Sequence, residues 1–362
     1  MLRDATQLVH YLLDRGLLSR SDVVEGPLSV VPTPRRNRNF KVRTRSGGLF
    51  VKSASGEDRT APQTLANEGH FLAALAEGSD HDPIAPRLLV HDERRSLLVL
   101  ELVAGATALG DYHRSRQTFP SQIGSAVGKA LAKFHHQAAT VAEPSRPDGQ
   151  RPWILSLHEQ PLEQLRYASP ANRRIVELLR EHDQFGQSLS ALRKDWVETG
   201  IIHGDLKWDN CLLIPRSESA FDVRFIDFEM VGRGDPLWDV GSLLHSYLAF
   251  WIWSMPASDD PAAMVATAPF PIEAMRLCLQ RFWDGYVEGV RLPAERQRGA
   301  LTKCVAYAGA RMIQTCYEAM VSSNEPPPSL LYVLQASMNV MASPAEAAAD
   351  LFGVVTYADA LR

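Results

Sequence analysis

Three polar side chains stand at fixed distances along the middle of the chain, and apolar residues lead into each of them. Asp205 follows the segment Ile201–Gly204, an amide stands five positions later at Asn210, and a second carboxylate, Asp227, stands seventeen positions after that amide. Phosphoryl transfer from a nucleoside triphosphate uses groups of these types. One carboxylate receives or orients the acceptor hydroxyl, and an amide and a carboxylate hold magnesium on the phosphates. The spacing therefore predicts a phosphotransferase that uses ATP and Mg²⁺.

Each of these residues also has an ordinary structural interpretation. An isolated aspartate after a glycine often caps a turn or a helix. Asp227, however, lies in an apolar run in which a carboxylate is costly to bury unless a cation accompanies it. Together the spacings favour Asp205 as catalytic base and favour Asn210 and Asp227 as oxygen ligands for magnesium. Glu229 is either a further contact of the metal site or a solvated loop residue.

Lys52 ends the short apolar run Leu49–Val51, which is typical of a strand. An ammonium at this position reaches the α- and β-phosphates of a nucleotide, and Glu68 is spaced to hold it from the following helix. The alternative is a lysine on an edge strand and a glutamate on an exposed helix face. The downstream motif favours the functional interpretation of both residues.

The composition is that of an ordinary globular protein. The chain has 362 residues, of which 45% are hydrophobic and 22% charged, so it is long enough for two or three compact units. Its formal charge of −4 gives no global attraction to nucleic acid or to an anionic membrane. The basic run from Arg35 to Arg45 is either the solvated face of a strand pair or a contact to phosphate.

We expect a cytoplasmic protein without a membrane partner. The four cysteines are widely spaced and form no CxxC pair, which suits a reducing compartment better than a zinc site or disulfides. Asp4 and Asp14 interrupt the apolar positions near the N-terminus, so that segment does not resemble a signal peptide. The most apolar segment, Leu243–Met255, contains His245 and is too short to span a bilayer.

Hydrophobic periodicity predicts an α+β fold in two parts. Residues 1–103 are expected to form a nucleotide-binding lobe, and residues 104–362 a helical lobe with the catalytic loop and the acceptor site. In the first lobe we expect helices over 4–15 and Thr64–Glu77, and strands over Leu28–Val31, Phe40–Arg43, Leu49–Val51, Arg87–His91 and Leu97–Leu102. In the second we expect strands over Cys211–Ile214 and Val223–Ile226, and helices over Ile123–His136, two within 161–198, Trp238–Ser254, Ile272–Glu288, Ala300–Met320 and Ser329–Met341. Segments 141–151 and 254–271 are expected to be surface loops.

In these motifs the chain resembles the aminoglycoside phosphotransferase and choline kinase superfamily, whose fold is that of the eukaryotic protein kinases. The family's HGDxxxxN segment supplies the base, here Asp205, and one metal ligand, here Asn210. Its strand-ending IDFE segment supplies the other ligand, here Asp227. The resemblance implies a bilobal protein-kinase-like fold with a small antiparallel sheet and one helix in the first lobe and a larger helical second lobe. The cofactors that it implies are ATP and Mg²⁺.

The same resemblance assigns further residues around the cleft. The segment Gly234–Asp239 matches the family's Gly-Asp-Pro…Asp run, in which Asp239 supports the catalytic loop, and His203 has a supporting role as well. Adenine is expected against the connector, where backbone groups of Glu101 and Val103 bind it.

Two departures from the kinase pattern concern the phosphates and the catalytic loop. Protein kinases cover the phosphates with a glycine-rich loop, whereas residues 31–39 are glycine-poor here, which leaves the details of phosphate binding open. Trp208 occupies a variable position of the catalytic loop. It is either a core anchor or part of the acceptor side of the cleft.

The acceptor is not identified by the sequence. Between Gly241 and Glu325 eight acids face seven bases, which is no sign of the strongly anionic pocket that a polycationic aminoglycoside requires. We expect a hydroxyl of an antibiotic-like or other small metabolite. One alternative is a Ser or Thr of a ribosomally made peptide precursor. A non-catalytic kinase-like binding module is a further alternative, disfavoured because Lys52, Asp205 and both predicted metal ligands are present. The oligomeric state and the choice between ATP and GTP stay open.

Overall fold

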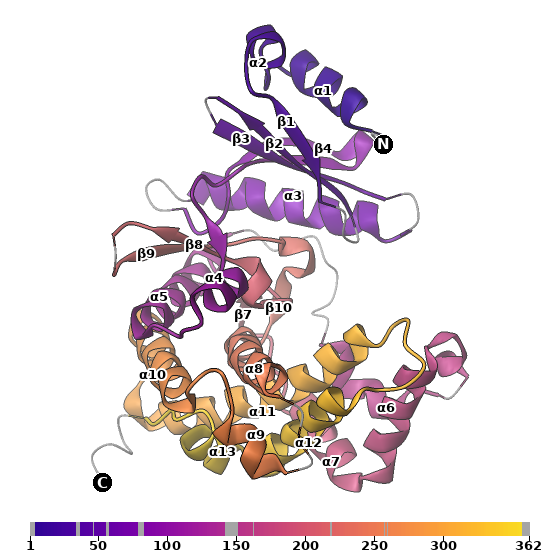
Figure 1. Ribbon diagram of the computed structural model, residues 1–362, viewed down its shortest axis with the longest axis vertical. Helices are drawn as coiled ribbons and strands as arrows, with labels where there is room; N and C mark the ends of the chain where they lie inside the picture. The colour runs from indigo at the N-terminus through magenta and orange to yellow at the C-terminus, as the bar shows by residue number, and fades with distance from the viewer. Residues whose placement is uncertain are drawn as a thin grey trace.

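Two lobes lie one above the other in the computed structural model (Figure 1). The structure describes residues 4–33, 37–45, 47–55, 58–78, 83–141, 151–161, 163–217, 219–256, 258 and 260–356. A five-stranded sheet with helices on both faces forms the first lobe, and helices form most of the second. This confirms the predicted α+β fold. Residues Arg35 and Arg36 and most of the segment 141–151 lie outside the described residues.

The sheet of the first lobe is antiparallel throughout. Successive side chains of a strand point to opposite faces. Val51 therefore packs with Leu8 and Leu12 on one face, whereas Lys52 points to the opposite face, toward the helix that follows its strand. The strand order is β1 (Ser29–Pro32), β2 (Arg38–Thr44), β3 (Gly47–Ser53), β5 (Leu97–Glu101) and β4 (Leu88–Asp92). The helices of this lobe are α1 (Ala5–Asp14), α2 (Arg20–Val24) and α3 (Ala61–Gly78).

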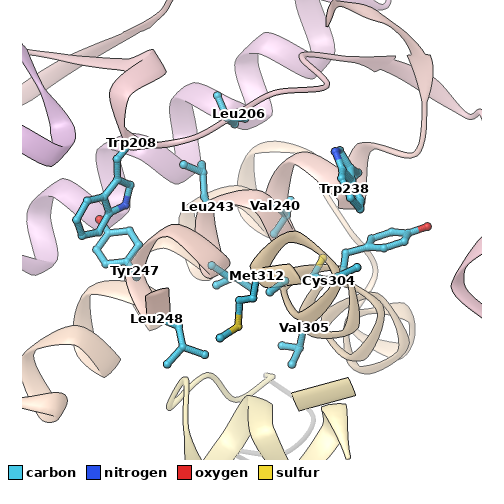
Figure 2. Packing of buried hydrophobic residues seen from close by; sticks show 14 of the residues in the cluster. Leu206, Trp208, Trp238, Val240, Leu243, Tyr247, Leu248, Cys304, Val305 and Met312 are labelled. Atoms are coloured by element: carbon cyan, nitrogen blue, oxygen red, sulfur yellow. The ribbon is translucent and has the colours of Figure 1, made fainter. Parts of the chain in front are cut away.

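The second lobe is built around helix pairs that pack very closely. Helix α5 (Ser121–Ala138) lies against α10 (Ile272–Gly289). A Cβ atom at Gly128 would lie 2.1 Å from the carbonyl oxygen of Phe282, so only glycine permits this approach. Helix α8 (Pro236–Ser254) packs on α11 (Ala294–Ala319), and Leu243 and Met312 belong to the cluster between them (Figure 2). The remaining helices are α4 (Leu109–Arg116), α6 (Pro170–Glu181), α7 (Asp183–Lys194), α9 (Pro261–Ala266), α12 (Pro328–Ala342) and α13 (Pro344–Asp350).

Short strands in the second lobe carry the polar motif. One pair is β7 (Gly200–Ile202) with β10 (Gly232–Gly234), and a second small sheet has the order β6 (Thr107–Ala108), β8 (Cys211–Pro215) and β9 (Phe221–Phe225). Strand β7 ends just before His203, and β8 begins just after Asn210. Strand β9 ends two residues before Asp227. The motif residues therefore lie at strand ends, where side chains are free to point out of the sheets.

The prediction for 254–271 was wrong in one respect. This segment was expected to be a surface loop, but it contains helix α9, whose first turn is capped by the side chain of Asp260. Aspartate followed by proline is a common helix start, so the Pro- and Asp-rich composition was compatible with either structure. Within the described part of the chain, no helix combines the length and apolar character needed to cross a membrane. All four cysteines are buried free thiols.

Candidate active site

Lys52 joins the two lobes through a pair of carboxylates. Its Nζ lies 2.7 and 2.8 Å from the two carboxylate oxygens of Glu68, on α3, and 2.7 Å from Oδ1 of Asp227, beyond β9. The side chains of Lys52 and Glu68 are almost fully buried. Burial alone would lower the pKa of Lys52, but Glu68 and Asp227 raise it, so the ammonium stays charged. The structure thus brings three of the predicted site residues into direct contact.

Asp227 has an unusual backbone conformation. Its φ of 72° and ψ of 54° lie in the left-handed region, which residues with a Cβ rarely adopt. Burial would raise the pKa of its carboxyl group, but Lys52 holds that pKa below its ordinary value. Strained backbone of this kind persists where surrounding structure fixes it, and it concentrates at functional sites.

The loop after β7 is held from below by Asp239, a fully buried residue of α8. Its carboxylate accepts hydrogen bonds from the backbone N–H groups of His203 (2.7 Å) and Gly204 (3.1 Å). It also lies 3.1 Å from Nε2 of His135, on α5. Gly204 has a φ of 80°, and a Cβ there would lie 2.6 Å from the Met230 carbonyl oxygen, so the sharp turn requires glycine.

His203 connects the loop after β7 to the end of β9. Its Nε2 donates to the carbonyl oxygen of Ile226 at 2.9 Å, and its ring packs on Phe228 with centroids 4.9 Å apart. Ile226 immediately precedes Asp227. The His203 side chain therefore fixes the distance between the two segments that carry the predicted base and a predicted metal ligand.

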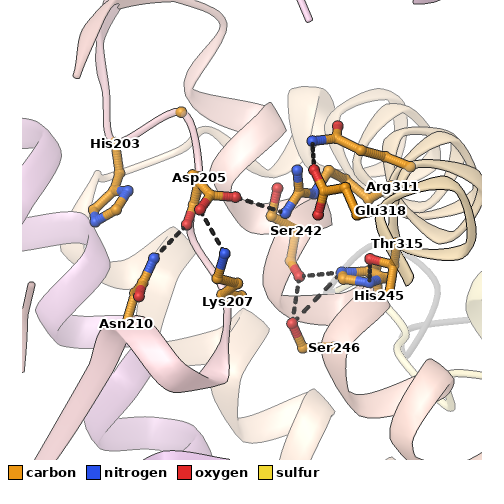
Figure 3. Close-up of polar contacts among 12 residues, drawn as sticks. His203, Asp205, Lys207, Asn210, Ser242, His245, Ser246, Arg311, Thr315 and Glu318 are labelled. Carbon is orange, nitrogen blue, oxygen red and sulfur yellow. Dashed lines mark hydrogen bonds and ion pairs between the residues drawn. The ribbon is translucent and has the colours of Figure 1, made fainter. Parts of the chain in front are cut away.

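The carboxylate of Asp205 lies between two cations (Figure 3). Its Oδ2 is 2.6 Å from Nζ of Lys207, and its Oδ1 is 3.2 Å from Nη2 of Arg311, on α11. Burial alone would raise the pKa of Asp205, but Arg311 and then Lys207 hold it below its ordinary value. The carboxylate is therefore ionised near neutral pH.

Neither cation was among the predicted site residues. Lys207 stands two residues after Asp205, so its position in the motif was a usable signal. Arg311 is 106 residues away in sequence and lies on the buried face of an ordinary helix. No local pattern indicates the partner of such a residue.

Asn210 is the last residue of a single 3₁₀ turn, Trp208–Asn210. Its Nδ2 donates to the backbone carbonyl of Asp205 at 2.8 Å, which leaves its side-chain oxygen available for another partner. Trp208 lies in the core, 5% exposed, with its ring centroid 4.6 Å from that of Tyr247 (Figure 2). The core interpretation of Trp208 is therefore the correct one.

A cavity of about 410 Å³ lies where the two lobes meet. Lys52 and Asp227 line it together with Asn210, and the connector from Glu101 to Val103 forms another part of its wall. Glu101 is ion-paired with Arg224 of β9. The described residues that line the cavity do not include Glu229. Apolar side chains of both lobes line it as well, among them Phe50, Leu100, Leu212 and Ile226.

Sequence comparison gives one family match. A model of the phosphotransferase enzyme family matches residues 28–278, a region that includes all the predicted site residues. Among curated proteins, none matches the chain.

Solved structures share the fold at low sequence identity. The choline kinase LicA from Streptococcus pneumoniae matches with a TM-score of 0.51 and 14% identity, over 93% of this chain and 99% of that one. The GDP complex of wild-type aminoglycoside 2′-phosphotransferase-IIIa matches with a TM-score of 0.55 and 14% identity, over 93% and 99%. A thermostable mutant of aminoglycoside phosphotransferase APH(4)-Ia, in a complex with ADP and hygromycin B, matches with a TM-score of 0.52 and 12% identity, over 93% and 97%. These likenesses confirm the protein-kinase-like fold.

Proposed function

Because the chain belongs to the phosphotransferase enzyme family, we propose that it transfers the γ-phosphoryl group of ATP to a hydroxyl of a small molecule. The observation that carries the proposal is the convergence of Lys52, Asn210 and Asp227 on one cavity, with Asp205 hydrogen-bonded to Asn210 through its backbone. Phosphoryl transfer depends on positioning and electrostatic stabilisation, which these groups supply. The boundary between the lobes near residue 103 is part of the same proposal.

The connector supports an adenine site. The N–H groups of Glu101 and Leu102 already donate to the carbonyls of Arg87 and Gly48, whereas that of Val103 has no partner within the described chain. An adenine edge presents an amino donor beside a ring-nitrogen acceptor. It therefore needs a C=O and an N–H close together, and we assign these to Glu101 and Val103. Lys52, held by Glu68, then faces the α- and β-phosphates.

Asn210 and Asp227 fit a magnesium ion. One atom of each side chain is occupied, because Nδ2 of Asn210 binds the loop carbonyl and Oδ1 of Asp227 binds Lys52. Each retains one oxygen, and two oxygen donors at one cavity suit a hard cation that keeps several waters. When bound, Mg²⁺ supplies positive charge to the phosphate oxygens.

Asp205 acts on the acceptor. Its carboxylate is 19% exposed and ionised, so it is able to accept the proton of an acceptor hydroxyl or to orient that hydroxyl. His203 and Asp239 act through the backbone by holding the loop in place.

The charges beside Asp205 argue against a polycationic acceptor. The ammonium of Lys207 and the guanidinium of Arg311 contact the two oxygens of this carboxylate. Two cations next to one anion repel further ammonium groups at short range. A neutral or anionic hydroxylated metabolite therefore suits this site better than an aminoglycoside.

The proposal is tested by mass spectrometry. The protein is incubated with ATP, Mg²⁺ and a panel of hydroxylated metabolites, antibiotics and Ser- or Thr-containing peptides, with Asp205→Asn as the inactive control. Addition of one phosphoryl group to a small molecule supports the proposal, and addition to peptides alone would move the assignment to the peptide-kinase alternative. Binding of Mg–ATP without turnover on any acceptor, and without hydrolysis, would indicate a binding module.

A further inference from the structure

Arg311 is a charged residue in a place where charge is costly. It lies on α11 within the second lobe, and only 1% of its surface is exposed. A buried guanidinium destabilises a fold unless a carboxylate and hydrogen bonds compensate for the lost hydration. The partners of Arg311 therefore indicate why a positive charge is kept at this position.

Its ion-pair partner among the described residues is Asp205, with Nη2 lying 3.2 Å from Oδ1. The guanidinium also lies over the ring of Trp238, 5.7 Å from the centroid. Its Nε and Nη1 are buried and have no hydrogen-bond partner in the described part of the chain. One carboxylate thus accounts for the ion pairing of this buried cation.

Neighbouring groups do not compete for Arg311. Glu318, about two turns further along α11, accepts instead from Nε2 of Gln314 at 2.7 Å (Figure 3). His245, on α8, donates from Nδ1 to the Ser242 carbonyl and accepts at Nε2 from Thr315. The neutral imidazole of His245 therefore has a hydrogen-bond partner at each of its two ring nitrogens.

The two oxygens of Asp205 face different surroundings. Oδ1 is tied to the buried Arg311, and Oδ2 is bound by Lys207, whose side chain is 35% exposed. A lysine that reaches the solvent is free to change rotamer, whereas the packed guanidinium is not. Arg311 therefore anchors one oxygen and leaves the other on the open side.

We propose that Arg311 is a positioning residue for phosphoryl transfer, fixing the Asp205 carboxylate so that Oδ2 meets the acceptor hydroxyl. The inference rests on the proposed function, because it assigns Asp205 to the acceptor. It makes α11 part of the catalytic machinery, although this helix lies far from the motif in sequence.

The first test separates kcat from KM. Arg311→Met removes the anchor, and misplacement of a catalytic group lowers the chemical step, so we expect kcat to fall by about 10- to 100-fold while KM for Mg–ATP changes by less than about twofold. Arg311→Lys keeps the charge and should restore part of the lost kcat. Arg296→Gln is the matched control, because it removes one exposed positive charge from the same helix.

The second test does not require turnover. Asp205→Asn, Arg311→Met and the double variant form a thermodynamic cycle measured by melting temperature. Asp205→Asn leaves the buried guanidinium without its ion-pair partner, and Arg311→Met leaves Asp205 with Lys207 alone. Each should therefore lower the melting temperature by several degrees, and the double variant should lose clearly less than the sum. Strictly additive changes in melting temperature would overturn the pairing of Asp205 and Arg311. The melting temperatures remain measurable even if Arg311→Met proves too unstable for kinetics at ordinary temperature.

The outcomes distinguish the two proposals. An active wild type with an equally active Arg311→Met variant would overturn the positioning role alone. A wild type without turnover on any acceptor would overturn the proposed function and, with it, the role of Arg311 in catalysis.

Discussion

Asp205 and Asp227 each occupy surroundings that cost free energy, and each has defined partners that offset this cost. Asp227 holds a left-handed backbone, which for a residue with a Cβ costs on the order of 1 kcal/mol. Its ion pair with Lys52 and the packing of the neighbouring apolar residues offset that cost. Asp205 lies between a buried guanidinium and a half-exposed ammonium. Because the two carboxylates have different partners, we expect removal of Asp205 and removal of Asp227 to affect different steps.

Asp205→Ala is expected to lower turnover by roughly 10²- to 10⁴-fold, the usual contribution of a general base. ATP affinity should stay within about twofold, because the proposed role of the carboxylate is on the acceptor and not on the nucleotide. Turnover is followed by ADP release and affinity by calorimetry. A large loss of ATP affinity with normal turnover would contradict the assignment of Asp205.

Asp227→Ala should weaken nucleotide binding when magnesium is present, because the variant loses a proposed metal ligand and a partner of Lys52. We expect at least a tenfold higher Kd for Mg–ATP, typical of the loss of one metal ligand or its close support. The measurement is repeated in EDTA, where the difference from wild type should shrink. Equal affinities in magnesium would show that Asp227 holds no metal.

At the scale of elements, a close contact between two helices bears on the support of the loop after β7. Helix α5 carries His135, which contacts Asp239, the residue that supports the loop after β7. The same helix is pressed against α10 through Gly124 and Gly128. The spacing between α5 and α10 therefore affects the position of His135, which contacts the residue that supports the loop, Asp239.

Gly128→Ala is expected to destabilise the fold by about 1–3 kcal/mol, the usual range for overpacking, because its Cβ would lie 2.1 Å from the Phe282 carbonyl oxygen. Gly299→Ala is the matched control. Gly299 lies in α11, and a Cβ there meets nothing within 4 Å, so this change should stabilise by roughly 0.5–1 kcal/mol through helix propensity. Urea unfolding measures both, and equal effects would contradict the close helix packing.

At the scale of the whole molecule, two buried histidines make the stability of the fold depend on pH. His113, on α4, donates from Nδ1 to the carbonyl of Thr118, and its Nε2 accepts from the Tyr247 hydroxyl. Burial lowers the pKa of His113 from 6.5 to about 4. Burial likewise lowers the pKa of His245 from 6.5 to about 3. Both imidazoles are therefore neutral in the folded protein.

Acid should destabilise the fold through these groups. In the unfolded chain His113 binds a proton below about pH 6.5, whereas in the folded chain it does so only below about pH 4. The stability that the neutral His113 contributes is therefore fully present above about pH 6.5 and is lost as the pH falls from about 6.5 to 4. The loss is on the order of 3 kcal/mol at most for this residue. His113→Phe should melt lower than wild type at pH 7.5 but lose less stability between about pH 6.5 and 4.5. An unchanged pH dependence of the melting temperature would contradict a neutral His113.

The spacing of residues along the sequence was sufficient to predict the polar motif and most of the helices and strands. The strands that flank Asp205, Asn210 and Asp227 follow from short apolar runs, and the family match and shared fold confirm the predicted architecture. Short elements such as α9 were missed, because a turn of helix and a loop share the same Pro- and Asp-rich composition. Among contacts between distant residues, spacing predicted that Glu68 holds Lys52, and the resemblance assigned Asp239 to the support of the catalytic loop.

What the amino-acid sequence determined by itself is the set of polar groups and their place at strand ends, since strand period and turn chemistry act over a few neighbouring residues. The contact of Lys52 with Glu68 was predicted from spacing, but tertiary structure alone decided that Lys52 also reaches Asp227 and that Arg311 reaches Asp205. Such pairings depend on how whole helices pack around a common core. That packing is the sum of many non-local contacts, and no short stretch of sequence encodes it.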